Sequence, residues 1–292
     1  RDFRRRNIQR ETCWSYPEVA RKSNNFTGKL LVVYALSPYT NNNCKLREIA
    51  ATEGYVNQDI IILPVCDVDP TTNKKVGEAG NWGWEAELTM SRKTYLWFKF
   101  SVEIFKKTNP YIIKADNDIF MRVPLYLKYL ELLPREKLNM GRAVGYYKDF
   151  SDEITWHTIG YASTLSRDVV KKIVDYDPLK KLVKAPIKFR NFESYMDFRA
   201  LNEDTMVGEV IRSKLKFEGL LTVDMQDCHF VMHAQTRGPT EAKSSCNIIA
   251  FHHILPYQYQ QLPLTSNTSI CAGKRNPVLR TINDQWAEFT CQ

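Results

Sequence analysis

The stretch that decides the fold of this chain is YIIKADNDIF at residues 111–120, in which a short apolar run leads directly into two carboxylates. Residues 111–115 are typical of a buried strand, because they are mostly apolar and are followed by polar, turn-forming residues. Ligand sites in open α/β sheets lie at the carboxyl ends of strands. Asp116 and Asp118 would point to the same side of a continuing strand. The pattern therefore predicts that both converge on a divalent cation and its anionic ligand.

Taken alone, the D-x-D pattern is weak evidence, because a polar turn that caps a strand has the same residues. A Ca²⁺ loop of the EF-hand type is excluded, since the segment lacks Gly at the sixth position and the closing Glu of such loops. This segment alone does not distinguish a binding site from a simple turn, and motifs elsewhere in the chain are needed for that.

Outside this segment, short β-rich runs alternate with longer amphipathic ones. This alternation predicts a layered α/β fold with a mainly parallel sheet flanked by helices. The expected strands are 29–36, 59–65, 111–115 and 143–147, and the expected helices are 85–105, 124–132, 166–175 and 204–215.

The helix expected at 85–105 has apolar residues mostly three or four positions apart, which predicts one buried face. Trp82 and Trp84 precede this helix and are more typical of packing aromatics than of platforms for a sugar ring. The apolar residues of the predicted face are Leu88, Tyr95, Leu96, Phe98 and Val102.

Length and composition indicate a folded globular protein. The chain has 292 residues, of which 43% are apolar and 25% are charged, so there is ample material for a hydrophobic core. This length fits one large α/β domain or two small ones. No stretch reaches the roughly 18 consecutive apolar residues that a membrane span requires.

The net charge of the chain is strongly positive, since 41 Lys and Arg outnumber 33 Asp and Glu to give +8. Such an excess favours a nucleic acid, an acidic membrane surface or a phosphorylated substrate, but it is also typical of a solvated surface. A nucleic-acid-binding module would interleave aromatic and basic residues on one face, whereas the aromatic residues here lie in apolar segments. We therefore expect no nucleic-acid partner. The Arg-rich start has no initiator Met, and we expect a segment before Arg1 to have been removed.

The seven cysteines include no C-x-x-C pair, which argues against a zinc ribbon and favours disulfides. Their odd number leaves at least one thiol free or paired between chains. Acceptor sequons at Asn25 and Asn267 agree with a secreted or luminal compartment. Beyond about residue 263 the chain becomes a polar tail, which we expect Cys271 and Cys291 to hold against the domain.

Several further segments match the sequence motifs of one known protein family, and they follow one another in the same order as in that family. Besides KADNDIF at 114–120, they are RNIQRETCW at 6–14, EGY at 53–55 with DII at 59–61, KT at 93–94, HTIGYASTLS at 157–166, EDTMVG at 203–208 and FHHILP at 251–256.

Together these segments resemble glycosyltransferase family 31, the inverting β1,3-glycosyltransferases, and the related protozoan transferases that use UDP-Gal or UDP-GlcNAc. The resemblance runs from about residue 4 to 259. The chain departs from the family pattern in several places. Asn117 stands where the family has the middle Asp of a triplet, and two adjacent histidines, His252 and His253, stand where the family has one. In addition, Cys13 is inserted before the Trp of the first motif, and the segment at 53–61 has extra residues.

The resemblance implies a fold of the GT-A type, made for nucleotide-diphospho-sugars. It implies a single luminal catalytic domain over 1–292, with a core at about 4–260 and a tail at 261–292 packed on it. The implied reaction is an inverting, metal-dependent transfer of GlcNAc or Gal from a UDP-sugar to a hydroxyl of a glycan acceptor, on a glycoprotein N-glycan or a GPI-anchor side chain. The linkage is most often β1,3 in this family. The implied location is the Golgi lumen, as a type II membrane protein whose anchor precedes Arg1.

The resemblance also implies the metal site. A bound Mn²⁺ or Mg²⁺ neutralises the charge that grows on a diphosphate leaving group. Asp118 and His252 are the expected ligands, and Asp116 reaches the metal, a metal-bound water or the ribose. His253 is the alternative to His252, and the spacing to Pro256 favours His252. A His ligand suits Mn²⁺ better than Mg²⁺.

Inverting transfer needs a base for the acceptor hydroxyl, and Asp204 matches the family position, with Glu203 as the alternative. Both are also typical of carboxylates that merely begin a helix. For the nucleotide, the expected contacts are Asp116 and Asn117, with Arg6, Arg10 and Lys93; the two arginines also fit an exposed basic flank. A catalytically silent relative that binds glycans or partner enzymes is the alternative function, and such a protein would lose the metal pair or the base.

Overall fold

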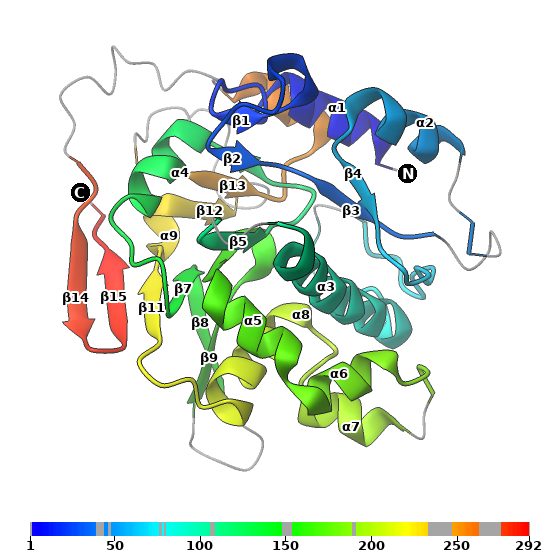
Figure 1. Cartoon of the computed structure of the whole chain (residues 1–292), viewed down its shortest axis with the longest axis vertical. Coiled ribbons are helices and arrows are strands. Elements are labelled where there is room, and N and C mark those ends of the chain that lie inside the picture. Colours follow the sequence, from blue (N-terminus) through cyan, green and yellow to red (C-terminus); the bar gives the residue numbers. More distant parts are fainter. Residues whose placement is uncertain are drawn as a thin grey trace.

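The apolar run at the centre of the sequence is a strand at one end of a six-stranded sheet (Figure 1). The computed structural model describes residues 2–38, 44–45, 48–75, 78, 80–105, 109–147, 154–188, 191–232, 247–262 and 276–291. The strands of the sheet, in spatial order, are β14 (Leu279–Asn283), β15 (Trp286–Phe289), β11 (Leu221–Asp224), β7 (Leu138–Gly141), β10 (Ser163–Ser166) and β5 (Tyr111–Lys114).

A mixed sheet flanked by helices was expected and is present, but only two of its five strand pairs are parallel, fewer than a mainly parallel sheet would have. β11 is parallel to both β7 and β15, whereas β10 is antiparallel to β7 and β5, and β14 is antiparallel to β15. It follows that β5, β7, β11 and β15 run in one direction while β10 and β14 run against them.

The strand β10 was not predicted from the sequence, because its residues are mostly polar. These polar side chains can be buried because they form hydrogen bonds inside the protein. Ser163, Thr164 and Ser166 are all buried. The Thr164 hydroxyl lies 2.6 Å from the Tyr126 hydroxyl, and Ser166 Oγ accepts a hydrogen bond from the backbone N–H of Leu138 at 2.8 Å. Buried polar groups are tolerated when they are paired in this way.

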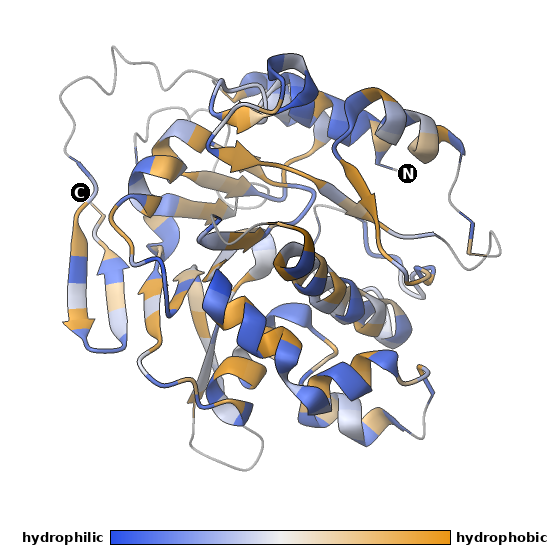
Figure 2. Ribbon diagram, in the orientation of Figure 1, coloured by the Kyte–Doolittle hydropathy of each residue, from blue (hydrophilic) through white to orange (hydrophobic). Residues whose placement is uncertain are grey.

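Helices cover one face of the sheet. They are α3 (Trp84–Ile104), α5 (Arg167–Asp175), α6 (Asp177–Lys184), α7 (Phe192–Asp197) and α8 (Glu203–Glu209), which a π-helical turn at Val210–Lys214 continues. Figure 2 shows α5 half apolar and half polar, as an amphipathic helix on a core requires. The predicted face of α3 is confirmed: Leu88, Tyr95 and Phe98 are buried, and Leu96 and Val102 pack against the same cluster.

The other face carries a second cluster of buried apolar residues. It includes residues of α4 (Val123–Leu130) and of a three-stranded sheet, in which β13 (Ala250–His252) is parallel to β12 (Phe230–Met232) and antiparallel to β6 (Phe120–Met121). Two smaller helical elements lie beside them, α9 (Gln226–His229) and a 3-10 helix at Pro256–Gln261. The hairpin of β8 (Ala143–Tyr147) and β9 (Ile154–Thr158) contacts α8.

The N-terminal region contains α1 (Phe3–Glu11) and, after three short strands, α2 (Glu48–Asn57). The strand expected at 29–36 is divided into two short strands with different partners. β2 (Leu30–Leu31) is parallel to β1 (Val19–Ala20), and β3 (Tyr34–Leu36) is parallel to β4 (Ile60–Ile62).

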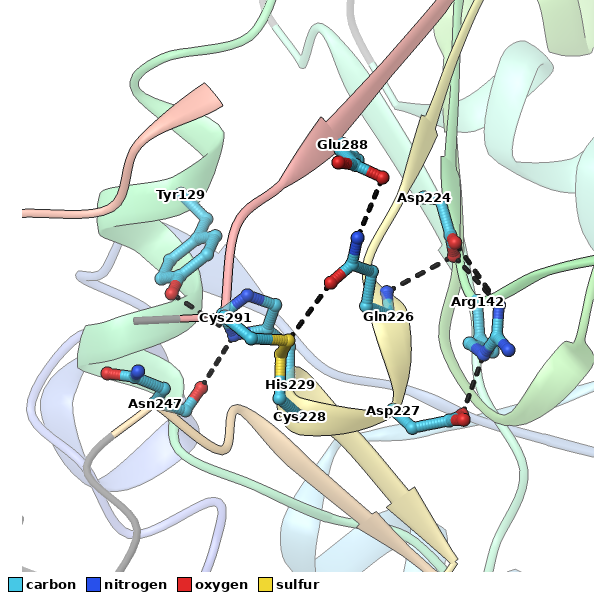
Figure 3. Close-up of a disulfide and its surroundings, with 10 residues drawn as sticks. All are labelled: Tyr129, Arg142, Asp224, Gln226, Asp227, Cys228, His229, Asn247, Glu288 and Cys291. Atoms are coloured by element: carbon cyan, nitrogen blue, oxygen red, sulfur yellow. Dashed lines mark hydrogen bonds and ion pairs between the residues drawn. A yellow bond between two sulfur atoms is a disulfide. The ribbon is translucent and has the colours of Figure 1, made fainter. Parts of the chain in front are cut away.

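The C-terminal residues that were expected to be a tail supply two strands of the main sheet, β14 and β15. A disulfide between Cys228 and Cys291 ties their end to α9 (Figure 3). Beside it, Gln226 Nε2 donates a hydrogen bond to Glu288 of β15 at 2.7 Å. The staple that we expected for this region therefore exists, with Cys228 as the partner of Cys291.

A second disulfide joins Cys44 to Cys66, while Cys13 is buried as a free thiol whose pKa burial raises to about 12. Asn25 lies exposed in a left-handed turn, where an acceptor sequon is accessible. Cys246, Cys271 and Asn267 lie outside the described residues. Within the described part of the chain, the helices are too short or too polar to cross a membrane.

Peptide mapping without reductant should recover the Cys44–Cys66 and Cys228–Cys291 bridges, and Cys13 should react with alkylating reagents only after unfolding. Replacing both Cys228 and Cys291 by Ser should lower the free energy of unfolding by about 2–4 kcal/mol, because the open chain gains entropy when it unfolds. Denaturant melts of the parent and the double variant provide the measurement. An unchanged unfolding midpoint would contradict a stabilising bridge.

Candidate functional site

The pairing of β13 with β6 brings a histidine from far along the chain to the two carboxylates that follow β5. Phe251 lies opposite Phe120 in this pair, and the backbone N–H of Ile254 donates to the carbonyl of Asp118 at 2.9 Å. His252, at the end of β13, therefore faces the D-x-D segment. Its Nε2 lies 3.1 Å from Asp118 Oδ1 and 3.2 Å from Asp116 Oδ2.

The surroundings of His252 combine burial with negative charge. The residue is 8% exposed, and its ring stacks on Tyr161 with 4.7 Å between ring centroids. Burial alone would lower the pKa of His252, but hydrogen bonds and charge from Asp116 and Asp118 raise it to about 9. For Asp116, burial alone would raise the pKa, and Lys114 and His252 together bring it well below its ordinary value.

These residues fit a divalent cation. One carboxylate oxygen of Asp118 and one ring nitrogen from each of His252 and His253 lie within 4.8 Å of one another; Asp118 and His252 are buried, and His253 is partly buried. The Nδ1 atoms of both histidines have no hydrogen-bond partner within the described residues. A set of one carboxylate and two imidazoles suits Mn²⁺ better than Mg²⁺. The sequence left His252 and His253 as alternative ligands. The structure places both beside Asp118, so both could serve as ligands together.

A largely enclosed lysine at the end of β5 joins the metal-type cluster, which consists of Asp116, Asp118, His252 and His253, to α8. Lys114 Nζ lies 2.8 Å from Asp116 Oδ1, 2.9 Å from Glu203 Oε1 and 3.3 Å from an oxygen of Asp204. Burial alone would lower the pKa of Lys114, but the three carboxylates raise it well above its ordinary value. Lys114 is therefore a permanent positive charge between three acidic groups.

Asp204 lies at the start of α8, where the Asn202 side chain caps the helix by accepting hydrogen bonds from the backbone N–H groups of Asp204 and Thr205. The Asp204 carboxylate leaves the helix and accepts a hydrogen bond from the backbone N–H of Gly160 at 2.6 Å. Burial raises the pKa of Asp204 to about 7; Glu203 and Asp116 add to the rise and Lys114 opposes it. A carboxyl group that titrates near neutral pH is well placed to take and release a proton.

Gly160 is required by this close approach. A Cβ atom at this position would lie 2.1 Å from Asp204 Oδ1 and 2.2 Å from Lys114 Nζ, so any side chain would displace one of the two groups. The turn at Gly160–Ala162 thus positions the carboxylate while leaving room for it.

The metal-type cluster and Asp204 line one cleft with a volume of about 730 Å³. Three of the residues expected to contact a nucleotide line it as well: Arg6, Lys93 and Asn117. Each has a partner in the protein, since Arg6 binds Glu53, Lys93 lies 3.1 Å from Asp67, and Asn117 donates to Asp2. Trp82 also lines the cleft, with Lys74 Nζ 4.7 Å from the centre of its ring.

Arg10 is not among the residues that line the cleft. Its guanidinium binds Asp59 through two hydrogen bonds of 2.6 and 2.8 Å and lies 2.7 Å from Glu53. The structure thus does not bring Arg10 together with the other expected nucleotide contacts, and its contact with a nucleotide stays a prediction. Arg10 instead ties α1 to the start of β4, because both of its acidic partners lie in α2 or just before β4.

Sequence reasoning gave no role to Lys114, Gly160 or Arg5, all of which line or shape the site. The signal for Lys114 was a charged residue at the end of an apolar strand, next to two carboxylates. Gly160 had no such signal, because its role depends on residues 44 or more positions away.

No family model matches this chain, and no curated protein matches it. The function of the cleft has to be inferred from its own residues, together with the motif resemblance of the sequence.

Lys114→Met should destabilise the protein by about 3 kcal/mol near pH 8, because it leaves three neighbouring carboxylates without their shared cation. Lys114 lowers the pKa of Asp116 and of Asp204, so without the ammonium group these two pKa values rise, and the loss should shrink as the pH falls and the two aspartates become protonated. Thermal melts between pH 5 and 8 provide the measurement. The exposed Lys99 pairs with Glu103 on α3, and Lys99→Met is the control, with an expected loss below about 0.5 kcal/mol. A loss for Lys114→Met that does not depend on pH would contradict this account.

Proposed function

We propose that this protein is an inverting, metal-dependent glycosyltransferase. It moves GlcNAc or Gal from a UDP-sugar to a hydroxyl of a glycan acceptor, on a glycoprotein N-glycan or a GPI-anchor side chain, and forms a β1,3 linkage. The observation that carries the proposal is the presence, in one cleft, of a cluster suited to a divalent cation and of a largely enclosed carboxylate, Asp204, whose surroundings raise its pKa to about 7.

Two chemical needs of the reaction match these two groups. Negative charge grows on the diphosphate as the glycosidic bond breaks, and a divalent cation held by Asp118, His252 and His253 would neutralise that charge. At the same time the acceptor hydroxyl has to lose a proton as it attacks the sugar. A single displacement of this kind requires both groups in the same cleft, with the sugar between them.

Asp204 is the residue that takes the proton. One of its oxygens accepts the short hydrogen bond from Gly160, and the other lies 3.3 Å from Lys114 Nζ, which leaves that oxygen a lone pair for the acceptor hydroxyl. Glu203 is 6% exposed and bound to Lys114 at 2.9 Å, so its position favours holding the lysine. The ammonium group of Lys114 stays in place throughout and keeps the acidic groups from repelling one another.

The disulfides support a luminal compartment, because such bonds form and persist in the secretory pathway. The Golgi lumen, a membrane anchor ahead of Arg1, the GT-A type of fold and the family 31 assignment all belong to this proposal and rest on the motif resemblance.

The experiment that tests the function is a panel of UDP-sugars assayed for release of UDP, with Mn²⁺ and with EDTA, in the presence and absence of glycan acceptors. Release that requires Mn²⁺ and an acceptor supports the proposal. A protein that binds UDP-sugars but transfers to no acceptor would be the catalytically silent relative instead.

Asp118→Asn should weaken Mn²⁺-dependent binding of UDP by at least tenfold, or about 1.4 kcal/mol, because it removes the carboxylate ligand while keeping its size. Calorimetry of UDP with and without Mn²⁺ provides the measurement. Asp175→Asn, on the exposed side of α5, is the matched control and should bind UDP like the parent. Equal affinity for parent and Asp118→Asn would remove Asp118 from the metal site.

Asp204→Asn should reduce the transfer rate by about 10²–10⁴-fold while donor binding stays within a few-fold of the parent, because the amide cannot accept the proton. In the parent, assayed with Mn²⁺, kcat/KM should rise with pH and level off at or below about pH 7, because only the ionised carboxylate acts as a base and a bound cation would lower its pKa from about 7.

The matched variant for the base is Glu203→Gln, which should keep the rise of kcat/KM with pH. If Glu203→Gln abolishes that rise and Asp204→Asn preserves it, Glu203 is the base and Asp204 holds Lys114.

A further inference from the structure

Arg5 lies on the face of α1 that packs against the D-x-D segment. Two residues of the same helix face contact this segment directly. Gln9 Nε2 donates to the carbonyls of Asn117 and Ile119 at 3.0 and 3.2 Å, and Asp2 accepts a hydrogen bond from Asn117 Nδ2 at 2.8 Å. Arg5 follows Asp2 by three positions and precedes Gln9 by four, so all three share one face of the helix.

The guanidinium of Arg5 is buried with unused donors. The residue is 6% exposed, it lines the cleft, and its Nε and Nη1 atoms have no hydrogen-bond partner within the described residues. A buried charge without a partner is costly, and proteins normally pair it. The neighbouring Arg6 and Arg10 follow that rule, because they bind Glu53 and Asp59.

A second unused donor belongs to the same cleft. Trp14 Nε1 is buried without a hydrogen-bond partner in the part of the chain that the structure describes, and Trp14 also lines the cleft. The other cations considered for the site are engaged, since Lys114 and Lys93 bind carboxylates. The lining of the cleft therefore includes both a cation-binding group of acidic and histidine side chains and a guanidinium, that of Arg5, that lacks an anion.

We propose that Arg5 binds a phosphate group of a diphosphate in this cleft, independently of any metal. The planar guanidinium presents parallel N–H donors that match two oxygens of one phosphate. A diphosphate that reaches from the metal-type cluster across the D-x-D segment to α1 would supply the negative charge that Arg5 lacks. This inference rests on the proposed function for the identity of the natural ligand, a nucleotide-sugar, but the binding of phosphate itself can be measured separately.

The test uses inorganic pyrophosphate and UDP as probes, titrated by calorimetry in EDTA so that no divalent cation contributes. Arg5→Gln should weaken pyrophosphate binding at least tenfold, and Arg5→Lys should recover part of the loss, because it restores the charge without the paired donors. Arg4→Gln, on the exposed side of the same helix, is the matched control and should bind within twofold of the parent.

Thermal melts without ligand distinguish a binding role from a structural one. Arg5→Gln should melt at or above the temperature of the parent, because it removes a buried charge that has no partner. A lower melting temperature for Arg5→Gln would show that the arginine supports the fold, and would overturn the inference. Equal binding of pyrophosphate by parent and variant in EDTA, or no binding by the parent, would overturn it as well.

The inference and the proposed function fail separately. If the parent protein binds pyrophosphate through Arg5 but transfers no sugar, the phosphate site is supported and the transferase activity is contradicted. If the parent transfers sugar and Arg5→Gln binds pyrophosphate normally, the transferase activity is supported and the phosphate site is contradicted.

Discussion

The arrangement of the cleft depends on the largely enclosed ammonium group of Lys114. It connects the end of β5 to the start of α8 through contacts of 2.8 to 3.3 Å with Asp116, Glu203 and Asp204. Two of these carboxylates come from a segment about 90 positions away in the sequence. Without a shared cation, three acidic groups would repel one another in a region of low dielectric constant. The lysine is therefore what allows acidic side chains from two distant elements to gather at one point.

The same lysine has different effects on the two aspartates beside it. Asp116 also faces His252, so its pKa falls well below the ordinary value. Asp204 is more deeply buried and has Glu203 and Asp116 nearby, and its pKa rises to about 7 in spite of Lys114. Neighbouring carboxylates whose pKa values move apart are a common sign of divided chemical roles. One is suited to remain an anion that helps to hold a cation, and the other is suited to exchange a proton.

The arginines of α1 differ in their partners although they are close in sequence. Arg6 and Arg10 bind Glu53 and Asp59 and so fasten α1 to α2 and β4. Arg5 turns toward the cleft, where no acidic partner is found for it among the described residues. Because the ion pairs of Arg6 and Arg10 hold α1 in place, Arg5 is left available for an anion from solution.

The sequence by itself determined the strand at 111–114, the buried face of α3 and the closeness of Asp116 to Asp118, because these depend on local periodicity and on positions along one segment. The mixed pairing of the sheet was not predictable in this way, since the polar β10 is stabilised by partners on other elements. Nor could the sequence tell Arg5 from Arg6, because adjacent residues of a helix point about 100° apart and only the neighbouring elements decide what each one meets. The tertiary structure alone brought His252 to Asp118 and Asp204 to Gly160, because both approaches depend on strand pairing and helix packing between distant parts of the chain.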